Sequence, residues 1–259
     1  MQTCFIIRRS RSESLYLTPF EDKKLSTKWK EDEEIQWYAS TGLHSQEKDN
    51  ALFTLYTQID RGVDRWIQDA RYVPRLVISA AVFLVVYFLF SFAIRDPIPM
   101  IDELIIATAS AIGTATFISR RDKKSDMAMK RRLELKQSAS RGDFEILEGL
   151  SSYENYLDTC LALDTLDVAD RLAMTGNADL PKLEVPEEQQ GEWQTELHER
   201  ILRHIELSDR KLYDRYQKVM RVRISETGDD VLSARLIKSA MRKEIDLSLL
   251  ALMVAISKQ

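Results

Sequence analysis

Two long apolar stretches stand in the middle of the chain, separated by a short polar connection. The first, "PRLVISAAVFLVVYFLFSFAI" from Pro74 to Ile94, is bulky, aromatic and β-branched. The second lies in "RDPIPMIDELIIATASAIGTATFISRR" and is rich in Ala, Gly, Ser and Thr. At about 1.5 Å per helical residue, about 20 residues cross a hydrocarbon core of roughly 30 Å. The pattern predicts a transmembrane hairpin over residues 74–121, whose second helix reaches that length only by including residues near Met100 and Ser119.

Basic residues flank this predicted hairpin on both outer sides, while its connection carries only Arg95 against three acids. Lys and Arg concentrate on the cytoplasmic side of a membrane, so we expect both termini in the cytoplasm and the hairpin in the inner (cytoplasmic) membrane. Pro97 and Pro99 favour a sharply turned connection. The basic flanks are Arg61, Arg65, Arg71 and Arg75 before the hairpin and Arg120, Arg121, Lys123, Lys124, Lys130, Arg131 and Arg132 after it.

The two apolar stretches suit different neighbours. Helices associate in lipid through close packing of small residues rather than through the hydrophobic effect. Small residues recur every four positions in the second stretch, where Ala109 precedes Gly113 and Ala111 precedes Ala115. We therefore predict that the second helix packs against protein through these four residues and that the chain forms a homo-oligomer, while the bulky first helix faces acyl chains.

One face of the second helix is polar. Glu103, Ala107, Ser110 and Thr114 are spaced by three and four residues and fall on one helical stripe. On one interpretation several copies of this stripe line an ion path, with a ring of Glu103 that favours cations. On the other, Glu103 complements the positive end of the helix dipole, and the hydroxyl groups bond to the preceding turn or to a neighbouring helix. Both interpretations stay open at this stage.

The flanking regions predict helices, apart from a short start. "CFIIRR" and "SLYLTPF" could pair as a β-hairpin. Apolar residues at intervals of three and four predict an amphipathic helix from Gln46 to Arg71 and further helices after the second span, one of them capped by Asp143. The final run "IDLSLLALMVAI" is too short to cross a bilayer and is expected in a buried core.

These elements predict an all-α membrane protein with a transmembrane hairpin, a helical cytoplasmic domain and the short N-terminal hairpin. The predicted organisation along the chain is an N-terminal segment over 1–45, a juxtamembrane amphipathic helix over 46–73, the hairpin over 74–121, a helical stalk over 122–175, a linker over 176–191, and a C-terminal helical domain over 192–259.

Composition narrows the functional classes. A mean hydropathy of -0.29 with 30% charged residues excludes a polytopic transporter, and a net charge of -4 gives no basic footprint for duplex nucleic acid. The short apolar run at the N-terminus does not make a signal peptide, so we expect the mature protein to retain the spans. His198 and His204 are six residues apart, where a zinc-binding HExxH helix needs four. Without a phosphate-binding loop, a CxxC pair or a nucleophile elbow, we predict no cofactor, no metal and no enzyme.

Arginine is abundant in the last third of the chain. Guanidinium groups suit phosphate, so Arg221, Arg223, Arg235 and Arg242 could bind an anionic signal such as a nucleotide or a short oligonucleotide. The alternative is that interleaved acids pair with these arginines along solvated helix faces.

The order of a cytoplasmic helix, a tight hairpin that contains "RDPIPMIDE", and a helical module resembles the two-transmembrane effector proteins of bacterial anti-phage systems over roughly residues 46–175. The resemblance implies a homo-oligomeric pore or channel that a cytoplasmic signal controls. The competing class is a membrane-anchored helical scaffold that recruits cytoplasmic partners.

Overall fold

A computed structural model describes residues 2–9, 13–21, 34–93, 101–174 and 180–257. Chain contacts divide it into two compact units. Unit 1 comprises Met1–Glu21, Glu33–Leu55 and Arg141–Gln259, and unit 2 comprises Asp22–Asp32 and Tyr56–Ser140. The N-terminal strands and the C-terminal helices, far apart in sequence, therefore fold together in unit 1.

Unit 1 contains a four-stranded mixed sheet in the order β2-β1-β3-β4. β1 (Gln2–Arg8) and β2 (Ser14–Leu17) pair antiparallel, which confirms the predicted N-terminal hairpin. β3 (Ile35–Ala39) joins β1 in parallel, and β4 (Asp143–Ile146) joins β3 in parallel. The third and fourth strands give the hairpin the additional pairing that a two-stranded ribbon needs for stability.

The sheet corrects the prediction of an all-α chain, because the protein is mostly helical but also contains these four strands. Asp143, expected to cap a helix, instead begins β4, and the next helix, α6, starts at Leu150. The apolar spacing after Asp143 suits a helix, but the backbone pairs with β3, and Trp37 stacks on Phe144 with ring centroids 6.0 Å apart. Non-local pairing overrides the local helical pattern here.

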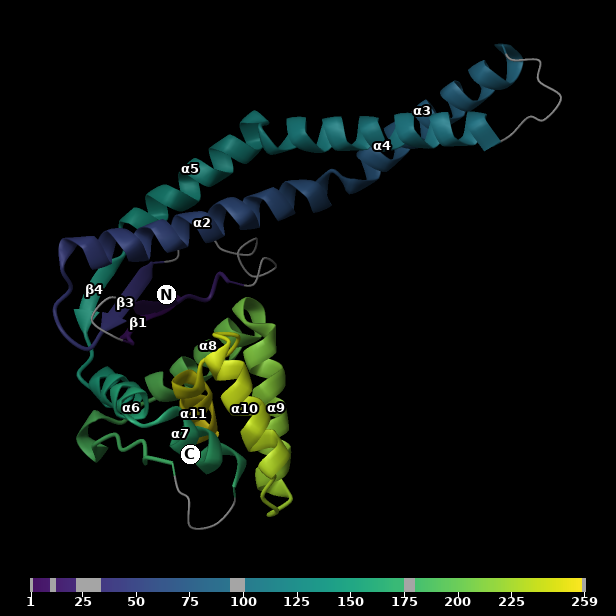
Figure 1. Cartoon of the computed structure of the whole chain (residues 1–259). Helices are drawn as coiled ribbons and strands as arrows, with labels where there is room; N and C mark the ends of the chain where they lie inside the picture. Colours follow the sequence, from purple (N-terminus) through teal and green to yellow (C-terminus); the bar gives the residue numbers. More distant parts are fainter. Residues whose placement is uncertain (1, 10–12, 22–33, 94–100, 175–179, 258–259) are drawn as a thin grey trace. The chain divides into compact units, whose positions relative to one another are not determined.

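The parallel pair β3–β4 is joined by a crossover that contains both apolar helices. The chain leaves β3 into α2 (Ser45–Ala70), continues through α3 (Tyr72–Ala93) and α4 (Ile101–Lys123), and returns through α5 (Asp126–Ser140) to β4 (Figure 1). Parallel neighbours always need such a crossover, commonly a single helix. In this chain the crossover is long enough to hold a membrane hairpin.

The predicted amphipathic helix is confirmed as α2. Its apolar positions recur at four-residue intervals, and the side chains of Ala51, Leu55, Ile59, Val63 and Ile67 are all buried. A helix whose apolar stripe is buried by its own protein has little apolar surface left to lie on lipid. The acids Asp60, Asp64 and Asp69 of α2 also disfavour attachment to anionic lipid headgroups.

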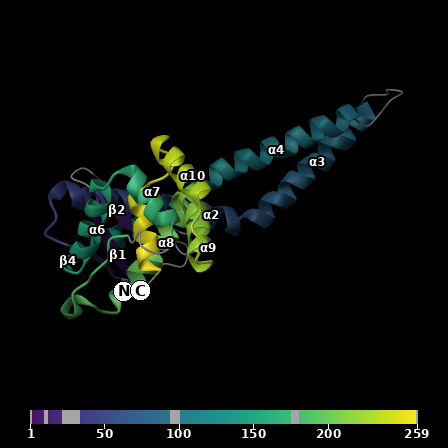
Figure 2. The ribbon, with the colours of Figure 1, turned by 60° about the horizontal axis from the view of Figure 1, so that its bottom comes forward.

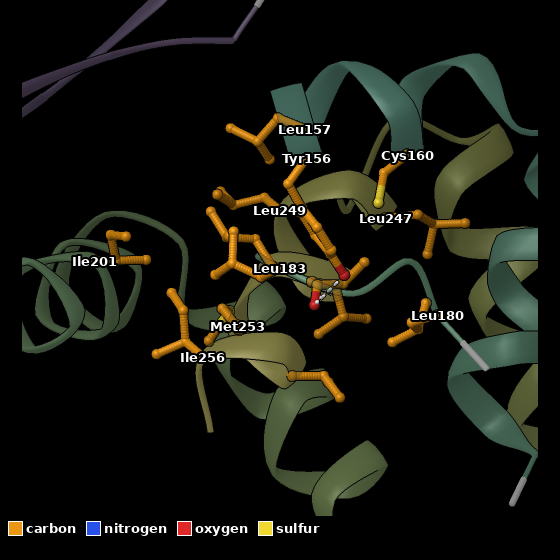
Figure 3. Packing of buried hydrophobic residues seen from close by; sticks show 14 of the residues in the cluster. Tyr156, Leu157, Cys160, Leu180, Leu183, Ile201, Leu247, Leu249, Met253 and Ile256 are labelled. Atoms are coloured by element: carbon orange, nitrogen blue, oxygen red, sulfur yellow. Dashed lines mark hydrogen bonds between the residues drawn. The ribbon is translucent and has the colours of Figure 1, made fainter. Parts of the chain in front are cut away.

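Helices complete unit 1 around the last one, α11 (Leu247–Ile256). The predicted burial of this apolar run is confirmed, since every residue from Leu247 to Val254 is buried. Tyr156 donates a hydrogen bond to the Ala251 carbonyl across 3.2 Å (Figure 3). Leu180 and Leu183, in the extended segment before η1 (Glu187–Gln189), pack on the same core. The surrounding elements are α6 (Leu150–Ala162), α7 (Thr165–Ala173), η1, α8 (Trp193–Ser208), α9 (Arg210–Ile224) and α10 (Asp230–Met241).

Arg8, at the end of β1, fixes the connection from β3 to α2. Its guanidinium donates to both carboxylate oxygens of Glu47, from Nε at 2.8 Å and from Nη2 at 3.0 Å, and also reaches Ser40 Oγ and the Gly42 carbonyl at 3.3 Å. Glu154 of α6 accepts from the Arg8 backbone N–H at 2.8 Å and from Ser40 Oγ at 2.6 Å. Such two-pronged pairs are among the stronger charged contacts. The start of α2 is therefore tied to β1 and α6.

This arrangement predicts a pH dependence. The hydrogen bonds from Arg8 lower the pKa of Glu47 below its ordinary value of 4.5. A carboxylate whose folded pKa is depressed adds stability above the unfolded pKa, and that stability disappears as the pH falls through the folded pKa. We expect Glu47→Gln to lower the free energy of unfolding by about 1.5–3 kcal/mol at pH 7, with a smaller difference in acid.

Urea denaturation of the full chain in detergent, followed by circular dichroism at stepped pH, measures this difference. Glu148→Gln, on an exposed acid before α6, serves as the control and should change little. A loss for Glu47→Gln that stays constant from neutral pH into strong acid would contradict the role of the Arg8 pair.

Candidate functional site

The hairpin of α3 and α4 is the first candidate site. Both helices are long and apolar enough to cross a membrane, with mean hydropathies of 2.3 over Tyr72–Phe92 and 1.4 over Ile101–Lys123. The two helices contact each other as a hairpin (Figures 1 and 2). The connection "RDPIPM" between them lies outside the described residues. Two helices of this kind are consistent with membrane association.

The predicted polar stripe of α4 lies on the side of α4 that packs along α3. Glu103 is 6% exposed and Ala107 is fully buried, while Ser110 and Thr114 are half-buried. Thr114 Oγ1 donates to the Ser110 carbonyl at 2.8 Å, but Glu103 Oε2 has no hydrogen-bond partner among the described residues. The structure thus brings the four residues together on one face, and in a single chain α3 covers that face. Whether the face lines an ion path stays a prediction.

The four small residues of α4 divide between two faces. Ala111 and Ala115 are half-buried, towards α3, whereas Ala109 and Gly113 are exposed on the opposite side. A methyl group added at Gly113 would meet nothing within 4 Å. The small residues therefore serve two purposes in space: one pair lets α3 approach α4, and the other pair leaves an open face that a second copy could contact closely.

The base of the hairpin holds a buried carboxylate. Asp122, near the end of α4, has a side chain 7% exposed, and its Oδ1 and Oδ2 atoms lie 3.4 Å from Arg71 Nη1 and 3.7 Å from Arg75 Nη2. Ser79, one turn beyond Arg75 on α3, is also buried. We call Arg71, Arg75 and Asp122 the base cluster. It joins the chain entering the first apolar helix to the chain leaving the second.

A second set of ion pairs joins α2 to α5 and the end of α4. Asp64 pairs with Arg132 and with Lys123 Nζ, the latter at 2.9 Å. Asp60 pairs with Lys136 Nζ at 2.9 Å and with Arg132 Nε at 3.7 Å. Arg132 also donates to the Lys123 carbonyl at 2.8 Å. We call Asp60, Asp64, Lys123, Arg132 and Lys136 the stalk ladder.

The two sets differ in energetic weight. Exposed or half-exposed pairs such as those of the stalk ladder are typically worth about 0–1 kcal/mol each and weaken in salt. Asp122 is buried, so removing its arginine partners would leave an uncompensated charge at a cost of about 3–5 kcal/mol. Of the two sets of ion pairs, the base cluster is therefore the one that costs more free energy when a partner is removed.

The predicted ligand arginines do not form one pocket. Arg223 donates from Nε to the Leu172 carbonyl at 3.3 Å and from Nη2 to the Arg171 carbonyl, so it satisfies the end of α7. Arg221, Arg235 and Arg242 are exposed. Arg215 in the middle of α9 contacts Ser239 near the end of α10 at 3.5 Å. Arg221 lies six residues further along α9, and Arg242 lies just after α10. These two arginines are therefore on opposite sides of the contact between α9 and α10.

The two histidines of "HERILRH" have separate partners. His198 Nε2 lies 2.7 Å from the Tyr153 hydroxyl, and His204 Nδ1 contacts Glu21 Oε1. Burial lowers the pKa of His198 and raises that of Tyr153 to about 12, so this pair stays uncharged at neutral pH. In the part of the chain that the structure describes, no three His, Cys, Asp or Glu side chains are grouped so that they could hold a metal ion.

A pocket of about 530 Å³ opens in unit 1 beside the turn before α11. Cys160 and Val168 contribute apolar surface, and Arg9 and Lys243 contribute positive charge. Arg9 is already paired with Asp246, the residue that caps α11 through its side chain. Burial raises the pKa of the Cys160 thiol, which keeps it protonated and unreactive. The pocket therefore combines a mixed-charge rim with no activated nucleophile.

The base cluster and the stalk ladder were not predicted as sites from the sequence. The sequence feature that could have found them is the presence of acids among the basic residues on either side of the two apolar helices. Asp60 and Asp64 alternate with the arginines of the flank before the first span, and Asp122 stands within the basic run after the second. Isolated opposite charges in such runs suggest pairing across helices.

Comparisons of this chain with models of known protein families, with curated proteins and with solved structures find no match.

The open face of α4 generates a prediction about assembly. Gly113→Leu adds a large side chain where a single hairpin has space, and Leu also has the higher helix propensity, so the hairpin itself should persist. A neighbouring copy packed against this face would be displaced. We expect the particle mass in detergent, measured by light scattering, to fall from an oligomer to a single chain.

Ile112→Leu is the control. It conserves the side-chain volume at the exposed neighbouring position, so it should keep the original particle mass. An unchanged mass for Gly113→Leu would show that this face is not the contact between copies.

Proposed function

We propose that the protein is a homo-oligomeric membrane channel or pore effector, gated by unit 1 and placed in the inner membrane with both termini in the cytoplasm. The observation that carries the proposal is the polar stripe inside an apolar hairpin. Glu103 is almost completely buried and one of its carboxylate oxygens has no partner within the described residues. Ionisable groups within membrane helices are costly and commonly mark ion or proton pathways.

Gating follows from the position of the stripe. In a single chain α3 covers Glu103, Ala107, Ser110 and Thr114, so this arrangement corresponds to a closed state. Conduction requires α3 to move aside or to exchange neighbours when copies associate through the face that bears Ala109 and Gly113. Because α2 and α5 continue directly from β3 and into β4, a rearrangement of unit 1 would move the two arms of the hairpin. Defence against phage is the biological setting that the sequence resemblance implies.

The same burial favours a second candidate, a membrane-anchored scaffold. If the stripe serves only to hold α3 against α4, the hydroxyl groups satisfy their own turns, as Thr114 does with the Ser110 carbonyl. The hairpin would then be an anchor and unit 1 a platform for cytoplasmic partners. A scaffold conducts no ions, so recordings of ion current distinguish it from a channel.

Planar-bilayer recording tests the channel proposal at Glu103. An acidic ring at a narrow mouth attracts cations, so Glu103→Gln should weaken cation selectivity and Glu103→Lys should shift the reversal potential towards anions. Asp102→Lys is the matched control, since Asp102 is exposed and points about 100° away around the helix. It should leave selectivity nearly unchanged. The absence of current from the wild-type protein under every condition would leave the scaffold as the function.

The signal that opens the channel is proposed to be an anionic molecule such as a nucleotide or a short oligonucleotide. Support comes from the exposed guanidinium groups of Arg221, Arg235 and Arg242, which can donate hydrogen bonds to the oxygens of a phosphate group. Calorimetric titration of the full chain with ATP and with short oligoadenylates tests this at low salt, where charge attraction is least screened.

We expect Arg235→Glu to weaken binding of these probes about tenfold or more. Lys211→Glu, on an exposed residue at the opposite end of α9 from Arg221, is the control for a general change in charge. Equal weakening by both changes would point to non-specific attraction, and no binding at low salt would exclude these arginines as the signal site.

A further inference from the structure

The order of charges along the two arms of the crossover reverses at the base of the hairpin. The outgoing arm consists of α2 and the start of α3, and the returning arm consists of the end of α4 and α5. In the stalk ladder the acids Asp60 and Asp64 belong to the outgoing arm, and their basic partners belong to the returning arm. In the base cluster the bases Arg71 and Arg75 belong to the outgoing arm, and the acid Asp122 belongs to the returning arm. The reversal falls between two adjacent residues, Asp122 and Lys123.

This reversal defines one register between the arms. Sliding the returning arm by a helical turn, about 5.4 Å, would in one direction move Asp122 away from Arg75 and towards Asp64, and in the other direction move Lys123 away from Asp64 and towards Arg71. Either displacement would separate an opposite-charge pair and bring like charges closer together, and in the first case the acid that moves, Asp122, is largely buried. Repulsion in a wrong register therefore adds to attraction in the right one as a determinant of specificity.

The base cluster is held but not fully satisfied. Its two contacts to Asp122 are long, at 3.4 and 3.7 Å. Two of its buried polar atoms, Asp122 Oδ2 and Arg75 Nε, have no hydrogen-bond partner within the described residues, and neither has Ser79 Oγ, one turn further along α3. Buried polar atoms without partners raise the free energy of the state that contains them. The cluster therefore fixes the register while retaining a driving force towards a hydrated arrangement.

We propose that the base cluster is a latch that keeps α3 over the polar stripe of α4 and that releases when α2 and α5 shift relative to each other. The latch rests on the proposed channel function only for its biological purpose. Its structural content, that the ion pairs of Asp122 control the exposure of the stripe, stands independently and is measured separately.

The experiment follows the exposure of Thr114, which is half-buried on the covered face of α4. Thr114→Cys is combined with Asp122→Asn in the full-length protein in liposomes, and the rate of modification by a charged, water-soluble methanethiosulfonate is measured. Both native thiols are buried and burial raises their pKa, so the parent protein gives a low background. We expect Asp122→Asn to raise the modification rate of Cys at position 114 at least fivefold.

The matched control is Asp69→Asn. Asp69 is an exposed acid near the end of α2 whose partner, Arg65, lies on the same helix at 3.3 Å. Its neutralisation changes the charge of the outgoing arm without touching either set of cross-arm pairs. It should leave the modification rate within twofold of the parent.

Rescue distinguishes pairing from a packing role. Arg75→Asp with Asp122→Arg exchanges the charges of the pair, and Arg71→Gln removes the remaining repulsion. A latch made of ion pairs should recover slow modification in this triple variant, whereas a packing role for the native side chains would not. Arg75→Gln alone provides a second measurement should Asp122→Asn fail to fold, and it should also raise the rate.

Efflux of an entrapped dye from the same liposomes separates the latch from the channel. Faster modification together with faster efflux supports both proposals. Faster modification without efflux keeps the latch and removes the channel. Modification at the parent rate in folded Asp122→Asn and Arg75→Gln proteins overturns the latch, whatever the efflux.

Discussion

The parallel pairing of β3 with β4 is the constraint on which the rest of the structure depends. Parallel neighbours cannot be joined by a tight turn, so the chain between them must make a crossover. In this protein the crossover contains α2, α3, α4 and α5. Both arms of the apolar hairpin are consequently anchored at adjacent strands, and the contacts of Arg8 and Glu47 fix the outgoing arm where it begins. The chain therefore passes between unit 1 and the hairpin twice, once along α2 and once along α5.

The polar residues of α4 face α3, whereas the outer surface of a hairpin in lipid would have to be apolar. Placing Glu103, Ser110 and Thr114 towards α3 avoids the cost of facing them to hydrocarbon, and it also places them where they would be released if α3 moved. The opposite face of α4 carries Ala109 and Gly113, which allow close approach of another helix. The same two faces support a channel and a scaffold, and the difference between them is whether α3 ever leaves the stripe.

Charge organises the region where the arms meet. No single pair of the stalk ladder is strong, because its members are partly exposed to solvent. In the base cluster the charges are reversed, because the buried acid Asp122 lies on the returning arm. The two sets together therefore select one register of the arms more strongly than either set alone, since displacement of the arms brings like charges closer together. The most selective contacts therefore lie at the end of the hairpin that continues into α2 and α5.

The sequence by itself determined the features that repeat along one segment. Apolar intervals specify α2, uninterrupted apolar length specifies α3 and α4, and a short apolar run specifies the buried α11. Only the tertiary structure decided which partner each face meets. β3 and β4 pair Gln36 with Asp143 across more than a hundred residues, Arg223 satisfies the end of α7 rather than a ligand, and α3 covers the polar stripe. The reason is physical: periodicity is a property of a segment and is set by local backbone geometry, whereas a partner is chosen by competition among contacts distant in sequence.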